Sequence, residues 1–254
     1  MPLVSQTLKE DVRRFWELQP CGAKTASAPV GTREFFDQVE RWRYSVEPFI
    51  PDIAGFESAK DKDVLEVGIG LATDFVRFVR AGARATGIDL TDAAVSAARE
   101  RLRLEGLEAN ALRADAEALP FEDASFDLVY SYGVLHHTPD TARAVREVHR
   151  VLRPGGEARI MLYSRRSWFA LAVWGRHVLR RRWPWHSLTR ALAQDLESPG
   201  TKAYTQEELE ALFAPFDRVE YRRFVTPYDR RVAGPLASLA GPRFGWFVAV
   251  TARR

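Results

Sequence analysis

The chain has 254 residues, 46% of them hydrophobic and 28% charged, and a formal net charge of +3. This composition is typical of a soluble globular protein, and the mild positive charge gives no argument by itself for a nucleic-acid partner. The single cysteine excludes an internal disulfide and fits a reducing compartment. Because the N-terminus lacks the apolar run of a signal peptide and no stretch reaches membrane-spanning length, we expect a soluble, cytoplasmic protein without a membrane partner.

The first region of the chain, residues 1–55, is expected to form a helical lid over a domain at 56–254. Helical patterns over 5–18 and 32–47 flank a loop rich in Gly, Ala, Ser and Pro, and prolines at 48 and 51 close the region. The Pro- and Gly-bounded loop suggests that the lid is mobile.

From residue 61 onward, short β-prone runs alternate with helical patterns. VLEVG precedes TDFVRFVRAG, ATGID precedes AAVSAARERLRLEG, and FDLVYSYG precedes TARAVREVHRVLRPGG. Such alternation predicts parallel βαβ units in a doubly wound α/β sheet with helices on both faces. A helical insert at 164–203 interrupts the pattern before the sixth strand, RVEYRRF, and WFVAVTA supplies the seventh.

A glycine turn joins the first strand to its helix in DVLEVGIGLATDF and predicts a nucleotide pocket. A dinucleotide fingerprint requires G-x-G-x-x-G or G-x-G-x-x-A, whereas the three positions here hold Gly68, Gly70 and the β-branched Thr73. This weakens the case for a nicotinamide-dependent oxidoreductase, and no Tyr is followed four residues later by Lys. Asp89, at the end of the second strand, would accept hydrogen bonds from ribose hydroxyls in either kind of pocket.

Further segments distinguish these alternatives. Glu66 lies two residues before the first glycine, Asp115 follows the third strand, SYGVLHHTPD follows the fourth, and LRPGG follows the next helix. In this order and spacing, the chain resembles the class I S-adenosylmethionine-dependent methyltransferases, particularly the small-molecule group that includes the ubiquinone and menaquinone methyltransferases. The segment EVGIGLA departs from the D/E-x-G-x-G-x-G motif only at Ala72.

The resemblance implies a Rossmann-like, seven-stranded, mostly parallel sheet whose last strand is antiparallel. It also implies S-adenosylmethionine as cofactor, with Asp89 on the ribose, Leu90 against the adenine, Asp115 accepting from the adenine amino group, and the remaining contacts around the methionine part. The expected cofactor-binding residues are Glu66, Gly68, Gly70, Thr73, Asp74, Asp89, Leu90, Asp115, Ala116, Ser131 and Tyr132.

The adjacent residues His136 and His137 raise the possibility of a metal site. Because neighbouring histidines point in different directions on a regular element and no Cys or carboxylate set completes a zinc site, we expect no metal. A contact of one histidine with substrate or ligand is possible, and a packed or capping role is the alternative.

The expected reaction is methyl transfer to a small molecule at an O, N or C atom, with natural-product metabolism as a plausible setting. The cofactor motifs name no catalytic residue; His136 and Tyr163 are weak candidates. The expected substrate-binding residues are Trp16, Tyr44, His136 and Tyr163, with Arg41 and Arg43 available for an anionic group. An RNA methyltransferase is the other alternative, but SYGVLHH stands where such an enzyme is expected to hold a flipped base in an Asn/Asp-Pro-Pro-Tyr type segment.

The basic and aromatic segment RHVLRRRWPWH, residues 176–186, has three interpretations. In the first, it continues a helix that exposes the arginines to solvent and packs Trp168, Phe169, Leu171 and Trp174 on the domain. In the second, it forms a pocket for an anionic or aromatic molecule. In the third, it is a nucleic-acid or membrane-surface patch. We expect the first, no nucleic-acid partner, and a monomer or homodimer.

Overall fold

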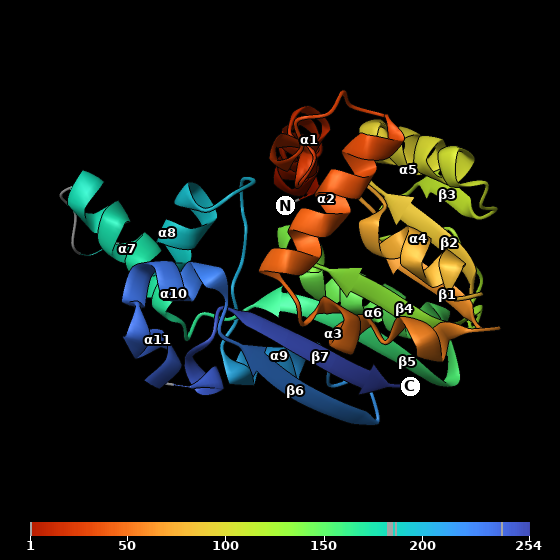
Figure 1. Ribbon diagram of the computed structural model, residues 1–254. Coiled ribbons are helices and arrows are strands. Elements are labelled where there is room, and N and C mark those ends of the chain that lie inside the picture. The colour runs from red at the N-terminus through yellow and green to blue at the C-terminus, as the bar shows by residue number, and fades with distance from the viewer. Residues whose placement is uncertain (1, 182–184, 186, 240) are drawn as a thin grey trace.

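The computed structural model describes residues 2–181, 185, 187–239 and 241–254, and its centre is a seven-stranded sheet (Figure 1). The strands lie in the order β3-β2-β1-β4-β5-β7-β6. All neighbouring strands pair in parallel except β7, which is antiparallel to both β5 and β6. The strands are β1 (Asp63–Val67), β2 (Arg84–Asp89), β3 (Asn110–Arg113), β4 (Phe126–Tyr132), β5 (Leu152–Tyr163), β6 (Arg218–Phe224) and β7 (Phe247–Arg253). The predicted doubly wound sheet with an antiparallel last strand is confirmed.

Helices bury the sheet on both faces, which explains why the central strands are apolar at consecutive positions. In β1, Val64 packs into a core with α4 and α5, while the next residue, Leu65, packs into a second core with α6 and α9. The helices after the first strands are α4 (Thr73–Arg80), α5 (Asp92–Glu105), α6 (Thr141–Val151) and α9 (Gln206–Leu212).

The N-terminal helices lie across the carboxyl ends of the parallel strands (Figure 1). They are α1 (Pro2–Leu18) and α2 (Arg33–Val46), followed by the short α3 (Ile50–Ala54). The fully buried Arg101 of α5 forms ion pairs with Glu40 of α2 and with Glu105 of its own helix. This ion pair links α2 to α5.

The insert and the C-terminal region form a second group of helices beyond the carboxyl ends of the parallel strands (Figure 1). These helices are α7 (Trp168–Arg181), α8 (Leu188–Asp195), α10 (Pro227–Ala233) and α11 (Pro235–Leu239). No helix in the described part of the chain is both long and apolar enough to cross a membrane.

One packing expectation for the insert is wrong. Leu171 was expected to pack on the domain, but its side chain is 43% exposed. Ala170, Val173 and His177 set the buried face of α7, and Leu171 points away from that face. Arg182, Trp183 and His186 of the basic segment lie outside the described residues.

Candidate active site

A cavity of about 220 Å³ opens where the carboxyl ends of β1, β2, β4 and β5 meet α1 and α2. In doubly wound sheets, ligands bind at this edge, at the point where the strand order reverses. That point here lies between β1 and β4, because β2 and β3 continue on one side and β5 on the other.

The glycine turn after β1 forms the floor of the cavity. Gly68 has a φ of +85° and Gly70 a φ of +50°, both in the left-handed region. A Cβ at Gly68 would lie 2.2 Å from a methyl carbon of Val134, whereas one at Gly70 would meet nothing within 4 Å. Gly68 is therefore required for packing, while Gly70 leaves open space at the cavity.

Asp89 lies beside this turn at the end of β2. Its Oδ2 accepts a hydrogen bond from the Gly70 amide at 3.1 Å, and its Oδ1 accepts from the amide and hydroxyl of Thr91. Thr91 also caps α5 by accepting from Ala94, so Asp89 is not used as the helix cap. Burial raises the pKa of Asp89, and the hydrogen bonds from Thr91 and Gly70 oppose that rise.

Glu66 is buried in the cavity wall, and its Oε2 has no hydrogen-bond partner among the described residues. Burial, followed by the neighbouring carboxylate of Asp74, raises the pKa of Glu66 well above its usual range. A protonated carboxyl group in this place can donate a hydrogen bond to a ligand, and an ionised one can accept.

Asp74 joins α4 to α2 and β4. Its carboxylate accepts from the Arg43 guanidinium at 2.9 Å, from the Tyr44 hydroxyl at 2.8 Å and from the Tyr130 hydroxyl at 2.9 Å. Asp74 and Thr73 both line the cavity. Tyr44, predicted to contact substrate, is instead engaged with Asp74 and is not among the cavity-lining residues of the described chain.

The expected adenine end lies against α1. Lys9 donates to Asp115 at 2.6 Å and to Glu117 at 2.7 Å, so α1 contacts the carboxylate that the resemblance assigns to adenine. Leu90 and Ala116 line the same end of the cavity.

The two remaining residues predicted to bind cofactor, Ser131 and Tyr132 at the end of β4, have different surroundings. Tyr132 lines the cavity, with the Arg43 guanidinium 5.0 Å from its ring centre. Ser131 is fully buried, donates to the Val67 carbonyl and is not among the lining residues in the described chain. Arg41 is exposed and paired with Glu34, also away from the lining.

At the other end of the cavity, aromatic side chains come from distant parts of the chain. Trp16 of α1 packs edge-on against His137, and Tyr163 stacks on Trp246 and Phe247. Trp16 and Tyr163, which the sequence predicted to bind substrate, both line the cavity. Burial and then Glu197 raise the pKa of Tyr163 well above its usual range, so its hydroxyl stays protonated and donates a hydrogen bond to Glu197.

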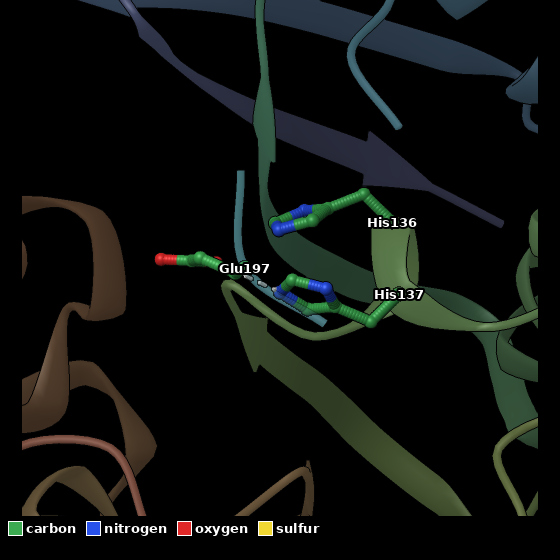
Figure 2. Close-up of side chains that lie close together, drawn as sticks. All are labelled: His136, His137 and Glu197. Atoms are coloured by element: carbon green, nitrogen blue, oxygen red, sulfur yellow. Dashed lines mark ion pairs between the residues drawn. The ribbon is translucent and has the colours of Figure 1, made fainter. Parts of the chain in front are cut away.

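The histidine pair differs from its expected arrangement (Figure 2). The rings of His136 and His137 lie on the same side of the chain with centres 4.3 Å apart, so the expectation that they diverge is wrong. His137 lines the cavity, whereas His136 lies behind it against the Tyr163 ring. Burial, followed by His137 and Lys202, lowers the pKa of His136 well below its usual range, so this imidazole is neutral.

Glu197 completes this cluster and was missed in the sequence. It follows α8 in the insert, accepts from the Tyr163 hydroxyl at 3.1 Å, and approaches His137 Nε2 at 3.3 Å. A lone Glu in a predicted loop carries no local signal for such a contact. The expectation that no carboxylate accompanies the histidines is therefore also wrong.

Known proteins match the central part of this chain. Residues 65–160 match the model of the methyltransferase domain family. The match covers β1 to most of β5, including the glycine turn, Asp89 and the histidine pair.

Among curated proteins, phthiotriol/phenolphthiotriol dimycocerosates methyltransferase of Mycobacterium tuberculosis is 43% identical over 97 residues, 37% of this chain and 35% of the relative. The 27-O-demethylrifamycin SV methyltransferase of Amycolatopsis mediterranei is 36% identical over 96 residues, 37% of this chain and 35% of the relative. The matched part of the chain thus spans about a third of the length of these relatives.

Solved structures agree over a larger part of the chain. A S-adenosylmethionine-dependent methyltransferase of Thermotoga maritima, titled a possible histamine N-methyltransferase, has a TM-score of 0.56 at 19% identity, covering 95% of this chain and 99% of its own. The [4+2]-cyclase SpnF has a TM-score of 0.58 at 19% identity, covering 99% and 94%. These likenesses show the methyltransferase fold, and the cyclase illustrates that the fold alone does not fix the reaction.

Proposed function

We propose that this protein transfers a methyl group from S-adenosylmethionine to a small-molecule acceptor. The observation that carries the proposal is the arrangement of Asp89 beside the Gly70 amide, at the cavity edge of a methyltransferase domain. A carboxylate at this strand end suits the two ribose hydroxyls of an adenosyl group, and the open space at Gly70 suits close approach of a ligand to the backbone.

Within this proposal, the cofactor runs from Asp115 and Leu90 at the adenine end to Gly70, Thr73 and Glu66 at the methionine end. The sulfonium is itself a strong electrophile, so the protein's main task is to hold the acceptor in line with the methyl group and exclude water. The acceptor carries the attacking lone pair, and the carbon–sulfur bond pair returns to sulfur, which yields S-adenosylhomocysteine.

The acceptor end of the cavity favours a molecule with an apolar or aromatic body and a polar group. Trp16, Tyr163 and Phe247 supply apolar walls, while Arg43 and Glu197 supply charges. The curated relatives named above act, by their names, on a mycobacterial dimycocerosate and on a rifamycin. We propose an acceptor of this kind, a small natural product or lipid rather than a nucleic acid.

We further propose that residues 1–55 act as a lid. The cavity volume of about 220 Å³ lies below the roughly 300 Å³ at the lower end for ligand pockets, so a cofactor and an acceptor require movement of a wall. Helix α1 is the best candidate, because Lys9 contacts Asp115 and Trp16 contacts His137 across the cavity mouth.

The test is calorimetric titration of the purified protein with S-adenosylhomocysteine, in parallel with NADH and NADPH. Micromolar binding of S-adenosylhomocysteine, at least tenfold weaker in Asp89→Ala, is the expected result. Binding of a nicotinamide in its place, or equal binding by the variant, would contradict the proposal. Asp92→Ala is a matched control, because Asp92 is an acidic residue near the same strand end that pairs with Arg113 and is not a lining residue in the described chain.

A further inference from the structure

The cluster of His136, His137 and Glu197 has a chemistry that methyl transfer from a sulfonium does not require. Two imidazoles and a carboxylate place their ligand atoms within 4.8 Å of one another (Figure 2). His137 and Glu197 line the cavity, and His136 lies behind it. Two histidines and one carboxylate are a common ligand set for divalent transition metals, with open positions left for substrate or water.

His136 is the first unexplained feature of this cluster. Its side chain is fully buried, and neither ring nitrogen has a hydrogen-bond partner among the described residues. A buried polar atom without a partner costs about 1–3 kcal/mol, so such atoms in folded proteins usually have a role. A metal ion bound through one nitrogen would supply the missing partner.

The contact between His137 and Glu197 is the second unexplained feature. The Thr201 hydroxyl donates to the Ser198 carbonyl at 2.7 Å and its oxygen lies 3.0 Å from His137 Nδ1, while the Ser198 hydroxyl lies 2.9 Å from the same nitrogen. On the other side of the ring, His137 Nε2 faces the Glu197 carboxylate at 3.3 Å. Either a ring proton on Nε2 or a bound cation can bridge these two atoms.

The geometry is close to that of a bound ion. Zinc–ligand distances of 2.0–2.1 Å in a tetrahedral site separate two ligand atoms by about 3.4 Å, which is close to the 3.3 Å between His137 Nε2 and Glu197. The ligand atoms, which lie within 4.8 Å of one another, must move closer together to bind one ion. Glu197 can make this movement, because its side chain is 38% exposed and lies on a loop. Outer contacts that orient a ligand histidine are typical of metal sites, and Thr201 and Ser198 provide them for His137.

We propose that His136, His137 and Glu197 bind a divalent transition-metal ion such as Zn²⁺, whose open positions face the acceptor end of the cavity. This reverses the expectation of no metal, which rested on diverging rings and a missing carboxylate. Since Glu197 belongs to the insert and the histidines follow β4, the ion would fix the insert against the methyltransferase domain.

The role of the ion rests on the proposed function. An acceptor hydroxyl bound to the ion would release its proton to solvent, and its oxygen would form the bond to the methyl carbon as the carbon–sulfur pair returns to sulfur. The proposal therefore favours an oxygen atom as the methylated position.

The experiment is equilibrium dialysis of the chelator-treated full chain against ZnCl₂ with elemental analysis, followed by CoCl₂ with visible absorption. We expect one ion per chain, at least tenfold weaker binding in His137→Gln and Glu197→Gln, and loss of the Co²⁺ absorption band in both variants. His149→Gln and Glu122→Gln are matched controls outside the cavity and should bind as the wild type does. Circular dichroism checks folding, and Glu197→Gln, at a partly exposed loop position, keeps the test valid if His137→Gln does not fold.

Absence of stoichiometric binding, or binding that survives both substitutions, would overturn the metal proposal and leave a shared proton between His137 and Glu197. The same wild-type preparation is titrated with S-adenosylhomocysteine. Zinc binding without S-adenosylhomocysteine binding would contradict the proposed function alone, and the reverse would contradict the metal site alone.

Discussion

The two glycines of the turn after β1 should respond differently to the same substitution. At Gly68, an alanine must adopt a φ of +85°, and its Cβ would lie 2.2 Å from one Val134 methyl carbon and 2.9 Å from the Val134 Cβ. The left-handed backbone costs about 1–2 kcal/mol and the overpacking about 1–3 kcal/mol more. Gly68→Ala should therefore lower the free energy of unfolding by about 2–5 kcal/mol.

Gly70→Ala is the matched comparison. Its φ of +50° carries the backbone cost of about 1–2 kcal/mol, but its Cβ would meet nothing within 4 Å. Ala72, two residues later, already has a φ of +58°, so alanine is tolerated in this turn. We expect Gly70→Ala to be the more stable variant by about 1–3 kcal/mol, while its added methyl group weakens S-adenosylhomocysteine binding.

Urea unfolding followed by tryptophan fluorescence measures the stability difference, and calorimetry measures ligand affinity. The double variant Gly68→Ala, Val134→Ala removes the methyl carbons nearest the new Cβ and should recover part of the stability that Gly68→Ala loses. Equal stability of Gly68→Ala and Gly70→Ala, or no recovery in the double variant, would refute the packing argument.

Two further predictions concern the cavity walls. Burial raises the pKa of Glu66 in the folded protein well above the unfolded value near 4.3. The folded state therefore keeps its full free energy of unfolding below about pH 4.3 and loses part of it as the pH rises and the buried carboxyl group must ionise. Glu66→Gln, which cannot ionise, should therefore gain stability relative to the wild type between pH 5 and pH 8 in thermal unfolding; a constant difference would contradict this assignment. Lys9→Met removes the ion pairs of α1 with Asp115 and Glu117, so limited proteolysis within 19–32 should accelerate at least threefold. An unchanged cleavage rate would show that these pairs do not hold the lid.

The glycine turn and Asp89, at the proposed cofactor end of the site, could be predicted to lie together because their determinants are local. A tight turn after a buried strand requires residues that accept a positive φ, and Gly68 and Gly70 supply them directly after β1. Asp89 lies at the end of the next strand, and parallel pairing of β1 with β2 brings it beside Gly70 without any long-range information. Strand alternation likewise predicted the sheet, with the antiparallel β7 supplied by the family resemblance.

The acceptor end was less predictable because its residues meet only through tertiary packing. Glu197 lies 60 residues after His137, in a loop whose sequence gives no periodic signal, and Trp16 comes from the opposite end of the chain. Tyr44 was expected to contact substrate, but its hydroxyl donates to the buried Asp74. The position of Asp74 on its helix did not reveal that contact. The sequence predicted substrate contacts for Trp16 and Tyr44 in the N-terminal region, but not which of these side chains faces the cavity.

This difference has a physical consequence for how the site is built. The cofactor end is fixed by backbone geometry at adjoining strand ends, so side-chain changes elsewhere leave it in place. The proposed acceptor end is assembled from the N-terminal region, the insert and β7. Glu197 of the insert contacts both Tyr163 and His137, and Ser198 and Thr201 of the insert also contact His137. A substitution at Glu197 should therefore alter acceptor choice and the position of the insert together, while the proposed ribose site at Asp89 is retained. Such a separation allows one reaction to be directed to different acceptors by change in the insert and the lid.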